Sequence, residues 1–463
     1  MAAGPVLAQF KQLASRGDHS ARKPVVEALE LALKKLNSYH IIKKHLKRKG
    51  DRLTFGQNSW DLAAKKNIYV IGGGKAANAM ARAIEEILGD RITAGIVAVK
   101  ELEPGDRLER IELVAAGHPL PDENSLVVSK RIFEIVQQAT PDDLFIGIIS
   151  GGSSALLSCP LPGITLEDEI ACTQKLLTSG ARILEINAVR RHVSAINGGR
   201  LAQAIDQKGA EMINFIISDG VGNAPATDLL EPARFFGTPV APDMTTFSDA
   251  CNVLEKYNLI GKVPASIVAF IRRANPRLET PKALSDRICH FVVQKVADAG
   301  TAAMEAATSI GIRASVLTTC LQGESREAGT FLACIAREIA TYHRPVAPPC
   351  VVIAVGETTT TIGDQSGLGG PSQELALGFA LEISGQKGVC MAAIDTDGTD
   401  GSTRSAGGIV DGLTVERAEN MGIDVYHRLQ MHDSLAVFQA LGDEIVTGNT
   451  GTNVCDLNLV SIL

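Results

Sequence analysis

The sequence of 463 residues has few aromatic side chains and no long apolar run. Phe, Trp and Tyr together make up 4% of the chain, with a single Trp. No stretch of about 18 apolar residues occurs, so a membrane span is not expected. The N-terminus also lacks the apolar core of a secretion signal. These absences favour a globular protein of the cytoplasm, although four basic residues and one acid in residues 1–23 leave a mitochondrial address open.

Paired cysteines and an excess of basic charge are missing as well. The nine cysteines are scattered, with no C-x-x-C pair and no zinc spacing, which indicates reduced thiols. The net charge of −7 argues against a nucleic-acid-binding surface. The one basic run, residues 43–49, closes a helical pattern, where cations complement the helix dipole. Neither a nucleic acid nor a membrane is therefore expected as a partner.

What the chain does contain is glycine, 44 residues of it, often where a predicted strand meets a helix. Strands predicted at 95–99, 111–115, 143–149 and 212–217 alternate with helices, such as one at 126–138 and one that Thr165 caps. This alternation predicts a parallel sheet covered by helices on both faces. We therefore expect an α/β protein with a Rossmann-like N-terminal domain over residues 1–240.

The second half predicts a smaller α/β domain over residues 241–463. Five prolines in 221–265 indicate a boundary or a lid. Beyond them the pattern predicts helices around 282–307 and 324–342, and a helix that ends at 383. It predicts strands at 313–319, 350–355 and 388–394. One long amphipathic helix is expected at 24–48. It packs either within the first domain or on the second domain.

The first candidate site is the turn that follows a strand beginning at Ile68. Gly72, Gly73 and Gly74 come after a β-branched run, Lys75 comes next, and a helical pattern starts at once. Glycine permits positive φ and close approach of a ligand, and a helix start attracts anions. The spacing fits a dinucleotide turn, but no acid stands about 20 positions on to bind a ribose. An exposed lysine on a tight turn is the simpler alternative.

Other polar residues follow predicted strands, and ligands of open α/β sheets bind at those strand ends. The third strand leads to His118, the fourth to a glycine–serine loop, and the fifth to Asp219. The glycine–serine loop offers backbone N–H groups and hydroxyls to an anion, and a nearby arginine pair can bind a carboxylate or phosphate. The residues of the glycine–serine loop are Ser150, Gly151, Gly152, Ser153 and Ser154, and the two arginines are Arg190 and Arg191.

The last predicted strand runs into a loop with three acids, Asp395, Asp397 and Asp400. The loop does not fit an EF-hand, because glycine falls at the wrong position and Ala406 stands where a bidentate glutamate is needed. Carboxylates at a strand end can still hold Mg²⁺ through one or two oxygens and water. The sequence therefore predicts a magnesium site here, with an ordinary Asp/Gly turn as the alternative.

Taken in order, these stretches resemble the MOFRL-type glycerate 2-kinases, a family also labelled hydroxypyruvate reductases. No single stretch is specific, but the ordered set covers nearly the whole chain. The stretches are Gly72–Ala77, Gly117–Pro119, Ser150–Ala155, Val189–Ala195 with Gly198–Ala202, Gly356–Thr359, Gly369–Gly370 with Gln373–Glu374, Asp397–Gly401, and Thr450–Asn453 with Asp456–Leu457.

The resemblance implies a two-domain α/β enzyme with its site in the cleft between the domains. It implies transfer of the γ-phosphoryl group of ATP to the 2-hydroxyl of D-glycerate, with Mg²⁺, and Lys75 matches the family's proposed catalytic lysine. Asp219 is the candidate carboxylate for the hydroxyl nucleophile. The nucleotide-binding candidates are Glu357, Thr358, Gly369, Gly370, Gln373, Asn449, Thr452 and Asn453.

The chain departs from the family pattern at three positions. Pro371-Ser372 stand where the family carries Arg-Asn, Asn197 stands where it carries Lys, and Arg404 stands where it carries an acidic or neutral residue. We therefore predict that Arg404 supplies the missing catalytic cation, with a surface arginine as the simpler alternative. A related sugar acid as substrate, an NAD(P)-dependent hydroxypyruvate reductase and a non-catalytic acid-binding protein stay open, as do a homodimer and which domain holds ATP.

Overall fold

The computed structural model describes residues 5–103, 106–222, 239–362 and 367–463, which belong to two compact units. The Rossmann unit comprises Ser38–Ser218 and Asn223–Val293, and the C-terminal unit comprises Met1–Asn37, Asp219–Gly222 and Gln294–Leu463. The predicted boundary at 240 differs from this division, because the Rossmann unit continues to Val293. The segment before Ser38 belongs to the C-terminal unit, which is one of the two placements that the sequence left open for the N-terminal helix. Part of the proline-rich stretch predicted as a boundary or lid, with Pro225 and Pro232, lies outside the described residues.

The Rossmann unit is built on a six-stranded sheet with the order β6-β5-β4-β7-β8-β9. Counted along the chain this is 3-2-1-4-5-6, the order of dinucleotide-binding folds. The pairs from β6 to β8 are parallel, as the sequence predicts. The strands are β4 (Ile68–Gly73), β5 (Ala94–Val99), β6 (Ile111–Ala115), β7 (Leu144–Ile149), β8 (Glu211–Ser218) and β9 (Ile288–Lys295).

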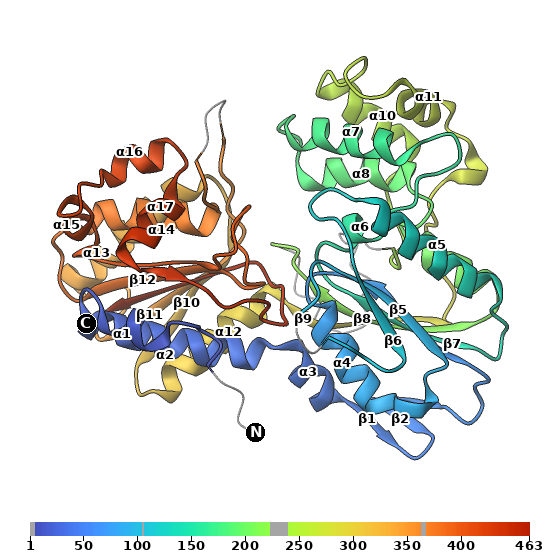
Figure 1. Cartoon of the computed structure of the whole chain (residues 1–463), viewed down its shortest axis with the longest axis horizontal. Helices are drawn as coiled ribbons and strands as arrows, with labels where there is room; N and C mark the ends of the chain where they lie inside the picture. Colours follow the sequence, from blue (N-terminus) through green and yellow to red (C-terminus); the bar gives the residue numbers. More distant parts are fainter. Residues whose placement is uncertain (1–4, 104–105, 223–238, 363–366) are drawn as a thin grey trace. The chain divides into compact units, whose positions relative to one another are not determined.

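Helices cover this sheet and also form a cluster of their own. Near the sheet are α3 (Ser38–His45), α4 (Ala77–Leu88), α5 (Glu123–Gln137), the short α6 (Ser153–Leu156) and α9 (Arg200–Gln207). The separate cluster contains α7 (Leu166–Leu177), α8 (Ile183–Val193), α10 (Phe247–Lys256) and α11 (Ala265–Arg273), which share an apolar core (Figure 1). The predicted cap is confirmed, since the Thr165 side chain accepts the backbone N–H of Asp168.

The long helix predicted at 24–48 is wrong, because the chain breaks it at Asn37. There α2 (His19–Leu36) ends in an extended residue, and the Asn37 side chain donates to the carbonyl of Thr450 at 2.8 Å. The basic run 43–49 closes α3 with Lys43, Lys44 and His45, as predicted, and then continues into β1 (Leu46–Lys49). β1 pairs with β2 (Arg52–Phe55), which pairs in turn with β3 (Asn58–Asp61), in a small antiparallel sheet. The helical spacing of apolar residues continues across Asn37, so the sequence gives no sign that the helix breaks there. The contact between Asn37 and Thr450 reveals the break.

The sheet of the C-terminal unit is mixed, with the order β10-β11-β15-β12-β13-β14. The last strand enters between β11 and β12 and runs antiparallel to both. As a result β11 and β12 point the same way and end at one edge, although they are not neighbours. The strands are β10 (Arg313–Leu321), β11 (Cys350–Gly356), β12 (Val389–Asp395), β13 (Gly407–Asp411), β14 (Glu444–Ile445) and β15 (Asp456–Ile462).

Helices lie on both faces of this mixed sheet (Figure 1). One face carries α13 (Ser325–Tyr342), α14 (Pro371–Glu382), α16 (Val425–Gln430) and α17 (Ser434–Leu441), with α15 (Thr414–Glu419) nearby. The other carries α1 (Phe10–Ser15), α2 and α12 (Val296–Ser309). The single helix predicted at 282–307 is therefore wrong in its first half, where the β-branched and aromatic run forms β9 before α12 begins.

A buried ion network joins α2 to the C-terminal sheet. Arg22 is fully buried, and its Nε donates to Asp411, while Nη1 and Nη2 donate to the two carboxylate oxygens of Asp443 at 2.7 and 2.8 Å. Arg417 reaches the same Asp443 at 2.7 Å. Buried charges need such partners, so the N-terminal helix is an integral part of this unit.

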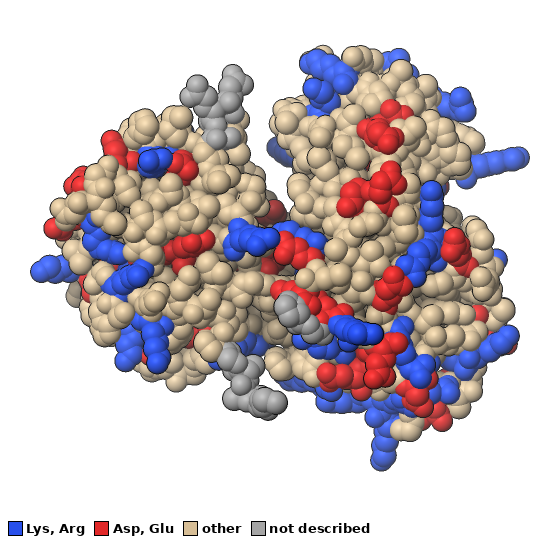
Figure 2. Space-filling view, viewed as in Figure 1, with Lys and Arg blue, Asp and Glu red and all other residues tan. Residues whose placement is uncertain are grey.

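The exposed charges of the chain are mixed in sign. Lysine and arginine side chains alternate with aspartate and glutamate over the face seen in Figure 2. Among the described residues, no helix combines the length and the hydropathy that crossing a bilayer requires.

Candidate functional site

The glycine turn after β4 lies at the point where the strand order of the Rossmann sheet reverses. Gly72 and Gly74 have φ of +138° and +152°. A Cβ on Gly74 would lie 2.0 Å from Ser150 Oγ, so only glycine fits this close approach of the two loops. The half-buried Lys75 follows, and α4 begins two residues later. The predicted strand–glycine turn–helix is thus confirmed as a structure, at the usual ligand position of such sheets.

The loop that follows β7 is fastened directly to this turn. The backbone N–H of Lys75 donates to Gly151 O at 2.9 Å, and that of Ala76 donates to Ser150 Oγ at 3.0 Å. On its far side the loop is held by Asn197, whose amide donates to the carbonyls of Ser154 at 3.4 Å and Leu157 at 3.2 Å. The two glycine-rich loops predicted to share an edge are therefore bonded to each other.

His118, which follows β6, reaches the same place. A Cβ added to Gly152 would lie 2.9 Å from His118 Cδ2 and 3.2 Å from Lys75 Cγ. Three segments that are far apart in the sequence thus meet around Gly152, and a side chain at this position would collide with the imidazole. The structure brings the side-chain stem of Lys75, the imidazole of His118 and glycine-rich backbone together, which is a suitable place for an anion.

The consecutive arginines of α8 have different environments. Arg191 is 4% exposed, and its Nη1 donates to Asp243 at 2.9 Å. The neighbouring His192 is fully buried and makes a 2.7 Å hydrogen bond with Glu279. Arg190 is half-buried, no ion pair to it is formed within the described ranges, and its Nε is without a hydrogen bond. Burial lowers the pKa of Arg190, which the charge of Glu169 opposes.

The structure thus distinguishes Arg190 from Arg191, which the sequence analysis treated alike. The guanidinium of Arg191 is committed to a buried aspartate and therefore holds the fold together. The buried Nε of Arg190 has no hydrogen-bond partner, and a guanidinium without an ion pair within the described residues is suited to a carboxylate or phosphate.

In the C-terminal unit three loops gather at one edge of the sheet. In the strand register, Asp456 lies opposite Gly356 on one side and opposite Asp395 on the other. The loops after β11 and β12 therefore lie beside the loop that precedes β15. All the predicted nucleotide-binding and metal-binding residues of this unit belong to these loops or to the start of α14. The direction of β15, which the sequence did not predict, brings them together.

The predicted magnesium site does not fit the side chains at this edge. Both oxygens of Asp400 accept backbone N–H groups at the start of α14, from Ser372 at 3.0 Å and Gln373 at 2.9 Å. One oxygen of Asp397 accepts the backbone N–H of Thr399, and Asp395 accepts that of Asp397. Within the described part of the chain, no group of three or more His, Cys, Asp or Glu side chains is arranged to hold a metal ion.

Asp400 therefore caps the start of α14. Burial raises the pKa of its carboxyl to about 7, against the two backbone donors, which lower it. A carboxylate at a helix N-terminus also matches the helix dipole. This cap fixes Gly369 and Gly370, and a Cβ on Gly370 would lie 2.3 Å from the Asp400 carboxyl carbon.

Several of the side chains predicted to bind the nucleotide make hydrogen bonds within the C-terminal unit. Thr358 and Gln373 are buried, and their side chains contact Ser325 and Thr403 respectively. The Thr452 hydroxyl donates to Gln294 at 2.8 Å, and the amides of Asn449 and Asn453 bond Gly451 and Asp219. Glu357 is exposed. These residues therefore shape the loops of the C-terminal unit.

Asp456 is a residue that the sequence analysis did not select. It is 5% exposed, and burial together with the charges of Asp395, Asp400 and Glu357 raises its pKa well above the ordinary range. A buried, perturbed carboxyl group in a loop cluster is a typical feature of a functional site. The only signal in the sequence was its place at the end of the Thr450–Asn453 motif.

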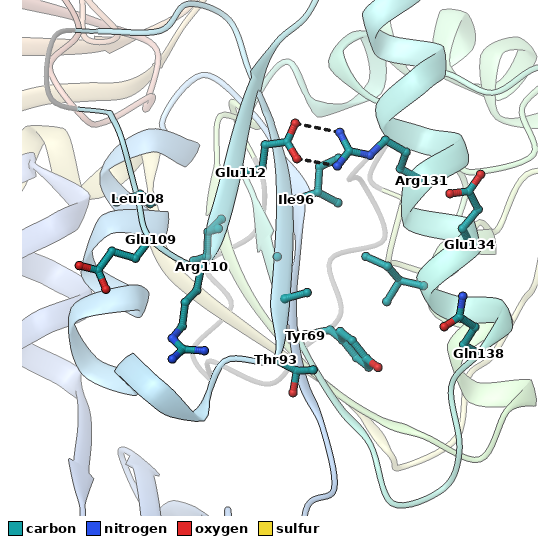
Figure 3. A pocket seen from close by; sticks show the side chains of 14 residues that line it. Tyr69, Thr93, Ile96, Leu108, Glu109, Arg110, Glu112, Arg131, Glu134 and Gln138 are labelled. Atoms are coloured by element: carbon teal, nitrogen blue, oxygen red, sulfur yellow. Dashed lines mark hydrogen bonds and ion pairs between the residues drawn. The ribbon is translucent and has the colours of Figure 1, made fainter.

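A separate hollow of about 730 Å³ lies at the opposite edge of the Rossmann sheet. It is lined by the starts of β4, β5 and β6 and by α5, and Figure 3 shows Glu112 and Arg131 paired at its wall. Their hydrogen bonds measure 2.8 and 2.5 Å, and Arg110 donates to the carbonyl of Ile92. Because Glu112 and Arg131 are paired with each other and Lys75 lies at the other edge, this hollow is not the candidate active site.

Family models match both halves of the chain. A domain of unknown function, DUF4147, matches residues 25–272, and the MOFRL family matches residues 350–456. The chain is 41% identical over 425 residues to the glycerate 2-kinase of Pyrococcus horikoshii, covering 91% of this chain and 93% of that protein. This chain belongs to the glycerate 2-kinase family.

Other members of the glycerate 2-kinase family support the assignment. The D-glycerate 2-kinase of Thermotoga maritima is 39% identical, with 84% of this chain and 89% of that protein covered. A crystal structure of a glycerate kinase from the same organism matches with a TM-score of 0.77 and 34% identity, over 95% of this chain and 99% of the other. A relative from Agrobacterium vitis, 38% identical with coverage of 85% and 86%, carries the name putative hydroxypyruvate reductase. The predicted resemblance and the α/β fold class are confirmed.

Proposed function

We propose that this protein transfers the γ-phosphoryl group of ATP to the 2-hydroxyl of D-glycerate, giving 2-phosphoglycerate and ADP. One observation supports this proposal most strongly. Lys75, His118 and the Ser150–Ser154 loop meet where the strand order of the Rossmann sheet reverses. Phosphoryl transfer asks a protein mainly for positioning and for positive charge near the phosphate oxygens. A lysine within glycine-rich backbone supplies both.

The test is release of ADP by the purified protein. With ATP, Mg²⁺ and D-glycerate, a coupled assay should report ADP formation, and the product should be 2-phosphoglycerate rather than the 3-phosphate. A panel of C3–C6 hydroxy acids and sugar acids separates glycerate from a related substrate. Oxidation of NADH by hydroxypyruvate, with no ADP from any acid of the panel, would overturn the proposal.

We assign the acid substrate to the Rossmann unit, with Arg190 as the carboxylate-binding cation. Arg190→Met is expected to raise the KM for D-glycerate at least ten-fold while changing the KM for ATP much less, because a charged hydrogen bond typically contributes about 1.5–3 kcal/mol. Arg190→Lys should recover part of the affinity, because it restores a charge without the forked donors. Initial-rate kinetics with each substrate varied in turn measure this difference.

Arg191→Met is the matched comparison. It leaves the fully buried Asp243 without its ion-pair partner, so the melting temperature should fall, in contrast to Arg190→Met. An unchanged KM for D-glycerate in Arg190→Met would show that Arg190 does not bind the acid.

The nucleotide is assigned to the three loops of the C-terminal unit, where Gly369, Gly370 and the backbone around Asn453 offer N–H groups. Mg²⁺ enters with the ATP, held mainly by phosphate oxygens and water, since this ion keeps several waters and uses few protein carboxylates. The buried Asp456 and the half-buried Asp395 are the acids at this edge, and no catalytic step is assigned to them.

Two further roles are proposed for residues of this unit. Asp219, whose carboxylate accepts from Asn453 Nδ2 at 3.4 Å, is the candidate acceptor of the hydroxyl proton. Arg404 is exposed and, within the described ranges, has no hydrogen-bond or ion-pair partner. Its loop packs on Gly369 and Gly370, since a Cβ on Gly401 would lie 2.4 Å from Gly369 O. This contact of its loop with the glycines that precede Pro371 supports Arg404 as the second cation for the transferring phosphoryl group.

Hydroxypyruvate reduction with NAD(P)H is the second candidate. The strand order favours it, and so does Glu101, which lies two residues beyond β5, near the place of a ribose-binding acid. Lys75 stands against it, because an ammonium group inside the turn fits a triphosphate better than a dinucleotide bridge. The ADP and NADH assays described above distinguish the two.

A further inference from the structure

The chain passes between the two units at four points, after Asn37, Ser218, Gly222 and Val293. Three of these connections have almost no free length. Only Asn37 separates α2 from α3, Asp219 follows β8 directly, and β9 runs into α12 without an intervening residue. A flexible linker would absorb a local shift at one of its ends. Rigid elements that are joined end to end transmit such a shift instead.

Two of these connections are bonded to the loop that precedes β15. The side-chain amide of Asn37 donates to Thr450 O at 2.8 Å. Gln294, which is 1% exposed, accepts the Thr452 hydroxyl at Oε1 over 2.8 Å. Its Nε2 donates to Leu36 O at 2.9 Å. One buried side chain therefore links the end of β9, the end of α2 and this loop.

The third connection, Asp219, is bonded to the same loop. Asn453 Nδ2 donates to the Asp219 carboxylate at 3.4 Å, and Cys455 Sγ donates to the Asp219 carbonyl at 2.9 Å. The loop is also fixed to the segment that follows β12, because the Thr450 hydroxyl donates to Thr396 O and the Thr396 hydroxyl donates to Cys455 O. All of these contacts lie within the C-terminal unit.

We propose that Gln294 and Thr452 are positioning residues, which couple nucleotide binding in the C-terminal unit to binding of the acid in the Rossmann unit. The inference rests on the proposed function, which assigns the nucleotide to the loops of the C-terminal unit. A nucleotide that fixes the 450–455 loop also fixes, through these bonds, the three connections to the Rossmann unit. Each substrate then raises the affinity for the other by the same factor.

Thr452 acts through Gln294 and not as a ligand of the nucleotide. A hydroxyl group has one proton to donate, and Thr452 donates it to the buried Gln294. The Thr452 side chain is itself fully buried. Thr452→Val keeps the shape of this side chain, so it removes the link without changing the exposed surface of the loop.

The experiment measures the Kd of AMP-PNP, a non-hydrolysable ATP analogue, by isothermal titration calorimetry in Mg²⁺, without and with saturating D-glycerate. The wild type should bind the analogue at least about five-fold more tightly when the acid is present. In Thr452→Val and in Gln294→Met this ratio should fall below about two, while the Kd without the acid changes little. The double variant should behave like Gln294→Met alone, because both substitutions remove the same bond.

Ser461→Ala is the matched control. Ser461 is also fully buried, and its hydroxyl donates to Ala21 O at 2.7 Å, at the other end of β15 from the 450–455 loop. The substitution removes a bond of the same kind within the same unit. The melting temperature should therefore fall about as much as in Thr452→Val, but the ratio should stay that of the wild type.

The possible outcomes are distinct. A ratio of one in the wild type, a wild-type ratio in Gln294→Met, or a lost ratio in Ser461→Ala would each overturn the coupling. A weaker Kd without the acid and an unchanged ratio in Thr452→Val would make Thr452 a direct nucleotide ligand. ADP release by a wild type whose ratio is one removes the coupling alone and leaves the proposed function standing. Failure of AMP-PNP or D-glycerate to bind removes both.

Discussion

Replacing Lys75 by alanine is expected to lower kcat by on the order of 10²-fold or more, with a much smaller change in the KM for the acid. The Lys75 backbone is fixed by its bond to Gly151 and its side chain lies beside Gly152 and His118. A preorganised cation stabilises charge that develops in the transition state, so its loss reduces kcat rather than ground-state binding. Steady-state ADP release with each substrate varied gives both constants.

Two variants accompany this measurement. Lys66→Ala removes an exposed lysine that precedes β4, at the other end of the strand, and should leave kcat unchanged. Arg404→Ala should lower kcat/KM at least ten-fold, and a restored arginine at position 371 should recover part of that loss. A wild-type rate in Lys75→Ala would make the lysine a bystander on a tight turn, and normal turnover in Arg404→Ala would remove it from the mechanism.

The largest effect on stability is expected for Arg22→Met. The substitution keeps the length of the side chain but removes a guanidinium that serves Asp411 and Asp443, both fully buried. Breaking a buried ion pair by removal of one partner typically costs about 3–5 kcal/mol, because the remaining charge is left uncompensated. Arg417 still reaches Asp443, so Asp411 loses more. Denaturant unfolding of the whole chain measures the loss.

Lys35→Met is the matched control on the same helix. Lys35 pairs with Glu305 at 2.6 Å, but both side chains are about half exposed, so the expected change is within about 1 kcal/mol. Equal stabilities of the two variants would contradict the view that α2 is anchored to the C-terminal sheet by its buried arginine.

Local patterns in the sequence were enough for the strands β4 to β8 of the Rossmann sheet and for its glycine turn. Runs such as Ile68–Ile71 are β-branched and apolar, and the three glycines after them leave few alternatives to a tight turn before α4. The periodicity failed at 24–48 and 282–307, where one element follows another with no glycine or proline at the junction. There the contact of Asn37 with Thr450 and the pairing of β9 decide the outcome.

The sequence by itself determined that Lys75, His118 and the Ser150–Ser154 loop follow strands of a parallel sheet, and hence that they meet at one edge. Only the tertiary structure decided that Arg191 is bound to Asp243 while Arg190 is not, and that Asp400 caps α14. It also decided that Asp456 joins the loops after β11 and β12. These outcomes depend on contacts between segments far apart in the chain, and on the antiparallel entry of β15, for which residue spacing carries no signal.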